Sequence, residues 1–275
     1  MPRRLLALDL DGTLLRHDGG IDDRDAAAVR RALGLGVAVT LATGRLATGA
    51  LPTARALSLE APLVCADGVL LACGRTGCVL EQEPLDDVVV ESTLHAAVDR
   101  ALAPFVFLAG SIHADAVCAP LRSLVQAWTE HIVIHERLTA VQAAWRGEPV
   151  ATAFGVGARE SVESAGRAVE HACGPSAEVA TFALRGEVWA LRVRPPGWDK
   201  ARMLARLAER LDVTREHVCA VGDWVNDSPM LAWAGRAFAM ADAPEDVRLA
   251  ARETVGARRG EGGGVAEAIG RWLGR

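Results

Sequence analysis

Short apolar runs alternate with amphipathic segments at the start of the chain. The run from Arg4 to Leu10 predicts a buried strand that ends at a turn, because Asp-Gly-Thr closes the apolar stretch. The pattern then predicts a helix from Asp22, which can serve as its N-cap, to Leu33, and glycines at 34 and 36 end it. A second apolar run covers Val37 to Ala42. Strand, helix and strand at this spacing predict a βαβ unit.

The same alternation continues before the pattern changes. Residues Leu46 to Leu57 predict a helix, Pro62 to Ala66 a third strand, and the alternating residues around Arg75 to Gly77 a hairpin. A long helical pattern from Pro84 to Leu102 begins a different segment. In it, short strands alternate with helices, predicted at Phe105 to Leu108, Leu121 to Thr129, Leu138 to Trp145, Val150 to Val156, Glu160 to Cys173 and Val188 to Val193. This segment predicts a smaller α/β insert that ends at the proline pair 195–196.

Beyond the proline pair the opening pattern returns. The predicted elements are a helix at Lys200 to Leu211, a strand at Val218 to Val221, a helix at Asp227 to Ala234, a strand at Ala237 to Met240, a helix at Pro244 to Ala251 and a last helix from Val265. The fold class is therefore expected to be α/β, a doubly wound parallel sheet with one inserted α/β domain. The expected boundaries are a core over residues 1–83 and 196–275 and an insert over residues 84–195.

Composition narrows the class of protein. With 275 residues, 51% of them hydrophobic and 24% charged, the chain is typical of a globular enzyme with a substantial core. Its net charge of -5 and scattered basic residues exclude an electrostatic surface for nucleic acid or for an anionic membrane. No signal peptide or spanning segment is expected, and the six dispersed cysteines form no CxxC pair. We therefore expect a cytoplasmic protein; its oligomeric state is not predicted.

Polar side chains follow the predicted core strands and the start of one predicted helix. They are Asp9, Asp11, Thr43, Gly44, Arg45, Lys200, Asp223, Asn226 and Asp227. Ligands of open α/β sheets gather at the carboxyl ends of the strands, so these residues are the first candidates for a site. Asp9 and Asp11 point to the same face unless the strand has already broken at Asp11. Crowded carboxylates repel one another unless a cation is present, and Asp9, Asp223 and Asp227 supply oxygen ligands that suit Mg²⁺.

One basic residue is set apart by its type. Lys200 is the only lysine among the 30 basic residues, and all the others are arginine. A lysine at a helix start is ordinarily a solvated surface group. Here a strong preference for arginine has left one lysine, at the start of a helix that follows the insert, so we interpret Lys200 as functional.

Four motifs in order resemble those of the haloacid dehalogenase (HAD) superfamily of phosphotransferases, over nearly the whole chain. They are DLDGTLL at Asp9 to Leu15, LATGR at Leu41 to Arg45, Lys200, and GDWVNDSPML at Gly222 to Leu231. The GDxxND form, the position of the insert and the segment AMADAPEDVRLAA resemble the Cof-type phosphatases, which carry an α/β cap. The resemblance implies a phosphatase that acts on a small phosphorylated metabolite, such as a sugar phosphate.

The resemblance also implies roles for particular residues. Asp9 would be the nucleophile and Asp11 the general acid and base. Thr43, Gly44, Lys200 and Asn226 would bind phosphate. A Mg²⁺ ion would be held by Asp9, Asp11, Asp223 and Asp227. Arg45 and Asp67 are expected to face the substrate, although Arg45 could equally cap the helix that follows it.

The chain departs from the Cof-type pattern at two positions. It has Asp67-Gly68 and Asp242-Ala243 where those proteins usually have Asn-Gly and Asn-Ala. The first departure adds a negative charge near the expected substrate entrance, where it would disfavour highly anionic substrates or bind a hydroxyl or amine. The core motifs are intact, so the expected chemistry is unchanged.

Three other functions use related residues. A phosphosugar mutase forms the same phosphoaspartate, and Gly197-Trp198-Asp199-Lys200 resembles the eukaryotic-type phosphomannomutases. A receiver-type signalling domain also has acidic pairs, Thr and Lys, but at about 120 residues it lacks a large insert. A dehalogenase does not need the second acid, Asp11. The phosphatase is therefore the leading hypothesis, with the mutase as the alternative.

Overall fold

The computed structural model describes residues 3–126, 128–138 and 147–274, and the chain divides into two compact units. Unit 1 comprises Met1–Gly44, Ala50–Leu80 and Asp199–Arg275, and unit 2 comprises Arg45–Gly49 and Glu81–Trp198. Each unit is built around its own sheet, and each is described by itself.

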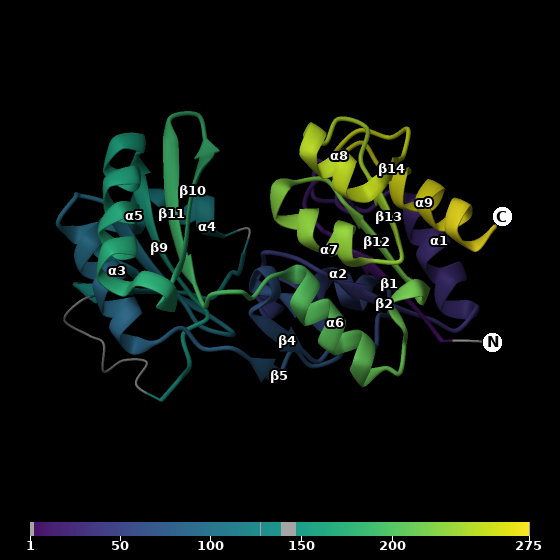
Figure 1. Cartoon of the computed structure of the whole chain (residues 1–275), viewed down its shortest axis with the longest axis horizontal. Helices are drawn as coiled ribbons and strands as arrows, with labels where there is room; N and C mark the ends of the chain where they lie inside the picture. The colour runs from purple at the N-terminus through teal and green to yellow at the C-terminus, as the bar shows by residue number, and fades with distance from the viewer. Residues whose placement is uncertain (1–2, 127, 139–146, 275) are drawn as a thin grey trace. The chain divides into compact units, whose positions relative to one another are not determined.

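Unit 1 contains a five-stranded parallel sheet with β1 (Arg4–Leu8) next to its centre (Figure 1). The strand order is β14 (Arg252–Thr254), β13 (Arg236–Ala239), β12 (Val218–Gly222), β1 and β2 (Val37–Leu41). Leu6 of β1 pairs with Cys219 on one side and with Val39 on the other. Strand β1 is buried on both faces, which explains its unbroken apolar run.

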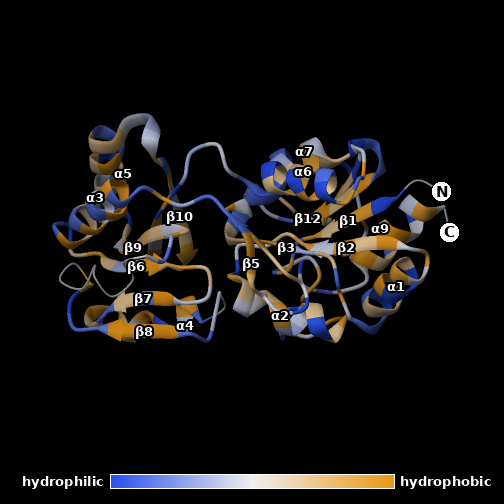
Figure 2. Ribbon diagram, turned by 90° about the horizontal axis from the view of Figure 1, so that it is seen from below, coloured by the Kyte–Doolittle hydropathy of each residue, from blue (hydrophilic) through white to orange (hydrophobic). Residues whose placement is uncertain are grey.

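Helices cover both faces of this sheet, as a doubly wound fold requires. On one face lie α6 (Lys200–Arg210) and α7 (Ser228–Trp233), while α1 (Asp23–Gly34) and α2 (Ala47–Ala56) lie on the other (Figure 2). Helix α9 (Gly264–Leu273) packs against α1, and α8 (Glu245–Ala251) packs against α7. The predicted N-cap of α1 is confirmed, because the Asp22 side chain accepts a hydrogen bond from the backbone N–H of Arg24.

A second, three-stranded sheet follows α2 along the chain. It consists of β3 (Leu63–Cys65), β4 (Leu70–Ala72) and β5 (Val79–Gln82), and a parallel bridge joins Ala42 to Val64. The predicted hairpin around residues 75–77 is confirmed, since the Cys73 N–H donates to the Cys78 carbonyl at 2.8 Å.

Unit 2 is a mixed six-stranded sheet with two helices on one face. The order is β10 (Glu178–Arg185), β11 (Val188–Arg194), β9 (Thr152–Ala158), β6 (Ala103–Phe107), β7 (Ile112–Asp115) and β8 (Ile132–His135). All neighbours are antiparallel except β7 and β8. Helices α3 (Asp87–Val98) and α5 (Arg159–Cys173) pack on this sheet (Figure 1), and their buried side chains form an apolar core with those of β6, β9 and β11.

The α/β fold class and the parallel core sheet are confirmed, and two details differ from the prediction. Strands β7, β8, β10 and β14 were not predicted. The helix expected at Leu121 to Thr129 is reduced to α4 (Arg122–Val125), preceded by a 3₁₀ segment, Ala116–Leu121. The helix expected at Leu138 to Trp145 falls almost wholly outside the described residues. Within the part of the chain that the structure describes, no helix is both long and apolar enough to cross a bilayer.

Candidate active site

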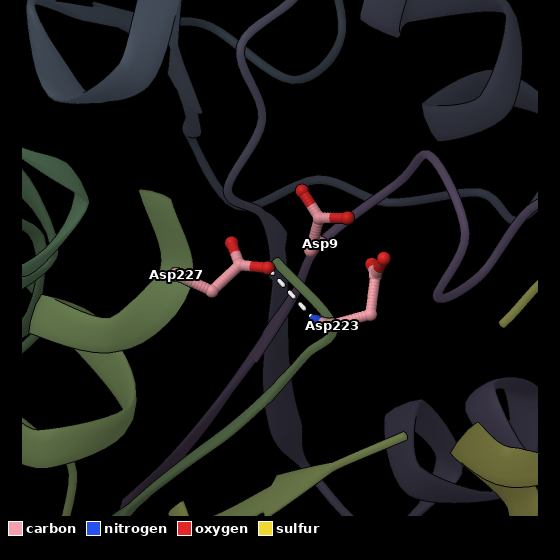
Figure 3. A group of neighbouring side chains, drawn as sticks. All are labelled: Asp9, Asp223 and Asp227. Carbon is pink, nitrogen blue, oxygen red and sulfur yellow. Dashed lines mark hydrogen bonds between the residues drawn. The ribbon is translucent and has the colours of Figure 1, made fainter. Parts of the chain in front are cut away.

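Three buried carboxylates meet at the carboxyl end of the parallel sheet. Asp9 follows β1, Asp223 follows β12, and Asp227 precedes α7. One ligand oxygen from each lies within 4.8 Å of the others, and Figure 3 shows the three side chains around a common space. Adjacent parallel strands end at the same edge of a sheet, so residues far apart in sequence meet there.

Lys200 lies between two of these carboxylates. Its Nζ donates to Asp9 Oδ1 at 2.7 Å and to Asp227 Oδ1 at 2.6 Å, and its side chain is fully buried. Burial alone would lower the pKa of Lys200, but the carboxylates of Asp227, Asp9 and Asp67 outweigh burial and raise this pKa. The ammonium is therefore charged, and it fixes the orientation of Asp9.

Asp227 uses both of its carboxylate oxygens within the protein. Besides the bond from Lys200 to Oδ1, Oδ2 accepts backbone N–H donors from Asp223 at 2.9 Å and from Trp224 at 3.0 Å (Figure 3). The side chain thus holds the loop after β12 against the start of α6. Direct ligation of a metal by Asp227 stays a prediction.

Asp223 is held by the turn after β1. Thr13 Oγ1 donates to Asp223 Oδ1 at 2.6 Å, a contact that the sequence analysis did not assign. Gly12 has a φ of +92°, and a Cβ at this position would lie 2.6 Å from Asp223 Oδ2. Glycine is required here both for the positive φ and for the close approach. The DGT motif therefore shapes the turn around the third carboxylate.

The charge of the site fits a divalent cation. Burial and the neighbouring Asp227 raise the pKa of Asp223 to about 6, and the same two causes raise the pKa of Asp9. When ionised, the three carboxylates carry more negative charge than Lys200 and Arg259, whose Nη1 lies 3.9 Å from Asp223 Oδ2, can balance. A divalent cation would offset the remainder, and carboxylate oxygens are the ligands that hard divalent ions prefer.

Asp11 lies apart from the carboxylate group. Strand β1 ends at Leu8, and Asp11 is an exposed residue in a turn that forms a bridge to Leu15. The strand has therefore ended before Asp11, so strand alternation does not place the Asp11 side chain on the same face as Asp9. The Asp11 carboxylate is not a member of the group formed by Asp9, Asp223 and Asp227, and its contact with a metal stays a prediction.

The structure also brings together the candidate phosphate ligands of unit 1. Thr43 is buried, and its carbonyl accepts the N–H of Asp67 at 3.0 Å. Asn226 Nδ2 donates to Asp67 Oδ1 at 2.8 Å, and a Cβ on Gly44 would lie 3.2 Å from the same oxygen. Asp67 has a φ of 53°, a left-handed conformation that Asp and Asn adopt more readily than most residues. Either residue type thus suits this turn.

Arg45 is assigned to unit 2 with Gly49, and its Nη1 donates to the Gly49 carbonyl at 3.4 Å. Gly49 lies in the first turn of α2, where the unsatisfied backbone groups are N–H donors, so this contact with a carbonyl does not cap the helix. Its predicted contact with substrate stays a prediction.

Comparison with known proteins identifies the family of this chain. The sequence model of the haloacid dehalogenase-like hydrolases matches residues 6–269, so the chain belongs to this family, and its Cof-type character is confirmed. It is an enzyme of the HAD phosphatase class, a phosphoric monoester hydrolase.

Similar proteins include phosphatases of small metabolites. The chain is 26% identical to the pyridoxal phosphate phosphatase YbhA of Escherichia coli K12, covering 93% of this chain and 94% of that protein. It is 28% identical to the HMP-PP phosphatase of Cronobacter sakazakii, covering 87% and 85% of the two chains. The crystal structure of a haloacid dehalogenase-like hydrolase from Bacteroides thetaiotaomicron has a TM-score of 0.85 at 26% identity, covering 98% and 99% of the two chains.

Proposed function

We propose that this enzyme hydrolyses the phosphate monoester of a small metabolite through an aspartyl-phosphate intermediate on Asp9, with Mg²⁺ as its cofactor. The observation that carries this proposal is the buried pair of Asp9 and Lys200, 2.7 Å apart, beside two further carboxylates. A carboxylate held in one orientation next to a fixed positive charge is suited to attack an anionic phosphate.

Asp9 and Asp11 would divide the reaction between them. Lys200 holds Asp9 Oδ1, so the other oxygen of Asp9 attacks phosphorus as the bond from phosphorus to the ester oxygen breaks. The exposed carboxyl of Asp11 gives its proton to the leaving oxygen. Asp11 then takes a proton from water, which attacks phosphorus, releases inorganic phosphate and restores the Asp9 carboxylate.

Asp9 and Asp223 would hold the metal, with Asp11 and Asp227 as the further predicted ligands. When bound, Mg²⁺ would neutralise the carboxylates and the phosphate oxygens, so that two anionic groups can approach. Thr43, the Gly44 N–H and Asn226 would donate hydrogen bonds to the phosphate, while Lys200 supplies its charge through Asp9. Arg45 and Asp67 are proposed to contact the rest of the substrate.

The proposed substrate is a small phosphorylated metabolite. The names of the two relatives support this class, since one is a pyridoxal phosphate phosphatase and the other an HMP-PP phosphatase. A sugar phosphate is the further member of the class that the motifs suggested. The proposal includes no nucleic acid or membrane partner and a cytoplasmic location.

The two aspartates of the first motif can be tested separately. Asp9→Asn removes the nucleophile, so no covalent intermediate forms. Asp11→Asn keeps the nucleophile but removes the base that activates water, so phosphoenzyme accumulates from an aryl phosphate, whose weakly basic leaving group needs little protonation. Intact-protein mass spectrometry after a rapid acid quench should show a phosphate-sized adduct in the Asp11 variant only. An adduct in Asp9→Asn would show that the nucleophile is another residue.

The mutase alternative predicts a different product. A mutase returns the phosphoryl group to the substrate, whereas a phosphatase passes it to water. Detection of free phosphate across a set of phosphorylated metabolites separates the two, and phosphosugar isomerisation without phosphate release would contradict the proposed hydrolysis.

A further inference from the structure

A second basic side chain of unit 1, Arg259, lies beside the carboxylate group. It belongs to the loop between β14 and α9, and its Nη1 is 3.9 Å from Asp223 Oδ2. Its guanidinium carbon lies 4.6 Å from the centre of the Trp224 ring, which is 45% exposed and directly follows Asp223. Stacking on an indole is attractive and holds the planar guanidinium in one orientation.

Asp242 holds Arg259 in this place. The backbone N–H of Arg259 donates to Asp242 Oδ1 at 2.7 Å, and Nε lies 3.6 Å from Oδ2. An asparagine, which Cof-type proteins usually have here, could accept the same N–H bond but would supply no charge. The aspartate at position 242, where the chain departs from the Cof-type pattern, therefore supplies a negative charge beside Arg259.

The loop is also fixed to the turn of the first motif. The N–H of Gly260 donates to the carbonyl of Gly12 at 2.8 Å, and the N–H of His17 donates to the carbonyl of Gly260 at 3.1 Å. Because Gly12 borders Asp223, these bonds place Arg259 at a defined distance from the site. An arginine that is already ordered loses less conformational entropy when it binds an anion.

Arg259 differs from Lys200 in accessibility and in charge balance. Lys200 is fully buried between two carboxylates, whereas the Arg259 side chain is 31% exposed. Asp242 is shared with a second cation, since Arg258 Nε lies 3.8 Å from the same Oδ2. Two guanidinium groups therefore face two carboxylates, Asp242 and Asp223, whereas the single ammonium of Lys200 alone faces two.

We propose that Arg259 binds a second anionic group of the substrate, a carboxylate or a phosphate, next to the phosphate that is hydrolysed. The planar guanidinium can donate two parallel hydrogen bonds to either group. This inference rests on the proposed phosphatase function, and it makes Arg259 a specificity-determining residue. Asp67 adds a negative charge to the part of the site near Asn226, so the substrate would meet opposite charges from these two residues.

The test compares matched substrates. Phenyl phosphate has no second anion, 4-carboxyphenyl phosphate adds a carboxylate, and phenyl diphosphate adds a phosphate. We expect the wild-type enzyme to have a higher kcat/KM for at least one of the two compounds with a second anionic group than for phenyl phosphate. Arg259→Met keeps a side chain that packs on Trp224. It should lower the ratio of these two kcat/KM values at least tenfold. The compound whose ratio falls identifies the second group as carboxylate or phosphate.

The neighbouring arginine provides the control. Arg258→Met removes an equally charged side chain, 65% exposed, and should leave the ratio within about twofold of wild type. Asp242→Asn should lower the ratio part of the way, because it keeps the N–H bond and loses the charge. An equal effect of both arginine substitutions would reduce the role of Arg259 to general electrostatics, and an unchanged ratio in Arg259→Met would overturn the proposal.

Binding provides a readout that does not depend on turnover. Wild-type and Arg259→Met proteins are titrated by calorimetry with three non-hydrolysable compounds. Phenylphosphonate carries one anionic group, 4-carboxyphenylphosphonate adds a carboxylate, and a phenyl compound with two linked phosphonates adds a second phosphonate. If the wild type prefers a compound with a second anionic group and Arg259→Met does not, the inference is supported even if phenyl phosphate is not hydrolysed. Absence of hydrolysis with intact binding preference would contradict the proposed function alone, and hydrolysis with no charge preference would contradict the inference alone.

Discussion

Lys200 shows how completely a site can depend on one side-chain shape. Its ammonium lies 2.7 Å from Asp9 and 2.6 Å from Asp227 in a fully buried space. Lys200→Arg keeps the charge, but the guanidinium is a planar fork that does not fit as a compact charge between two carboxylates. We expect turnover of an aryl phosphate to fall at least tenfold, about 1.4 kcal/mol of transition-state stabilisation. Arg202→Lys, on the same helix, is the control, and wild-type turnover in Lys200→Arg would show that the site requires a positive charge here but not the shape of lysine.

The crowded carboxylates also predict how pH and metal act together on stability. In the metal-free protein the pKa of Asp223 is raised by burial and by Asp227 to about 6, from an ordinary value of 3.8. A carboxyl with a raised folded-state pKa binds more protons folded than unfolded, so the free energy of unfolding falls as pH rises from about 4 to 6. A divalent cation stabilises the ionised form and should reverse this loss.

We therefore expect Mg²⁺ to raise the unfolding temperature more at pH 7.5 than at pH 5. Differential scanning fluorimetry with Mg²⁺ or with a chelator measures the shift, and Asp223→Asn should reduce its pH dependence, while Asp9, whose pKa is also raised, remains. An identical shift at both pH values in the wild-type protein would show that the carboxylates do not take part in metal binding.

At this scale the sequence predicts residue identity better than residue geometry. Asp9, Asp223 and Lys200 could be singled out because motif order and the rarity of lysine both point to them. The position of Asp11 depends on where β1 ends, which an apolar run that continues to Leu10 does not reveal. Thr13 and Arg259 were not assigned because their contacts with Asp223 join distant segments, and no local pattern marks such contacts.

Among the helices, α9 depends on a residue of α1. The residue before α9, Gly263, has no side chain to cap the helix, and Asp25 supplies the missing acceptors. Asp25 Oδ2 accepts the N–H of Gly263 and Oδ1 accepts the N–H of Ala266, both at 2.7 Å. The carboxylate thus binds two backbone donors at the positive end of the helix.

Loss of this cap should destabilise the protein. Asp25→Ala leaves two N–H donors without their acceptor in a fully buried position, and we expect the free energy of unfolding to fall by about 2 kcal/mol. Chemical denaturation monitored by circular dichroism measures the change. Asp23→Ala, at an exposed position of the same helix turn, should cost less than about 0.5 kcal/mol. Equal effects of the two substitutions would contradict a specific capping role for Asp25.

The elements that the sequence predicted share one property. The long helices and the buried strands of unit 1 carry enough periodic residues to be recognised, as in the run of β1. Strand β14 has three residues, and β7 and β8 have four each, which is too short for alternation to stand out. These strands form by pairing with neighbours, and pairing between distant segments leaves no local signal.

At the scale of the whole molecule, the chemistry and the insert belong to different units. Asp9, Lys200, Asp223 and Asp227 all lie in unit 1, while unit 2 has its own sheet and apolar core. Replacing residues 84–195 by a short flexible linker, which leaves β5 whole, should leave a cooperatively folded protein, because the strands of each sheet pair among themselves. We expect this protein to hydrolyse phenyl phosphate and to lose its discrimination among phosphorylated metabolites.

Two measurements check this expectation. Thermal unfolding shows whether the shortened protein folds, and kcat/KM across a metabolite set shows whether the order of substrates changes. The same order of substrates in a folded, shortened protein would show that unit 2 does not select them.

The position of β1 between β12 and β2 also determines when activity can arise during synthesis of the chain. Leu6 pairs with Val39, which the ribosome makes soon afterwards, but its other partner, Cys219, is made only after the whole of unit 2. At roughly 5–20 residues per second, one edge of β1 waits about ten to forty seconds for β12. Lys200 and Asp223 arrive in this same late stretch, so a nascent or truncated chain carries Asp9 without the groups that orient it. If these groups act as proposed, hydrolysis begins only in molecules whose synthesis is nearly finished.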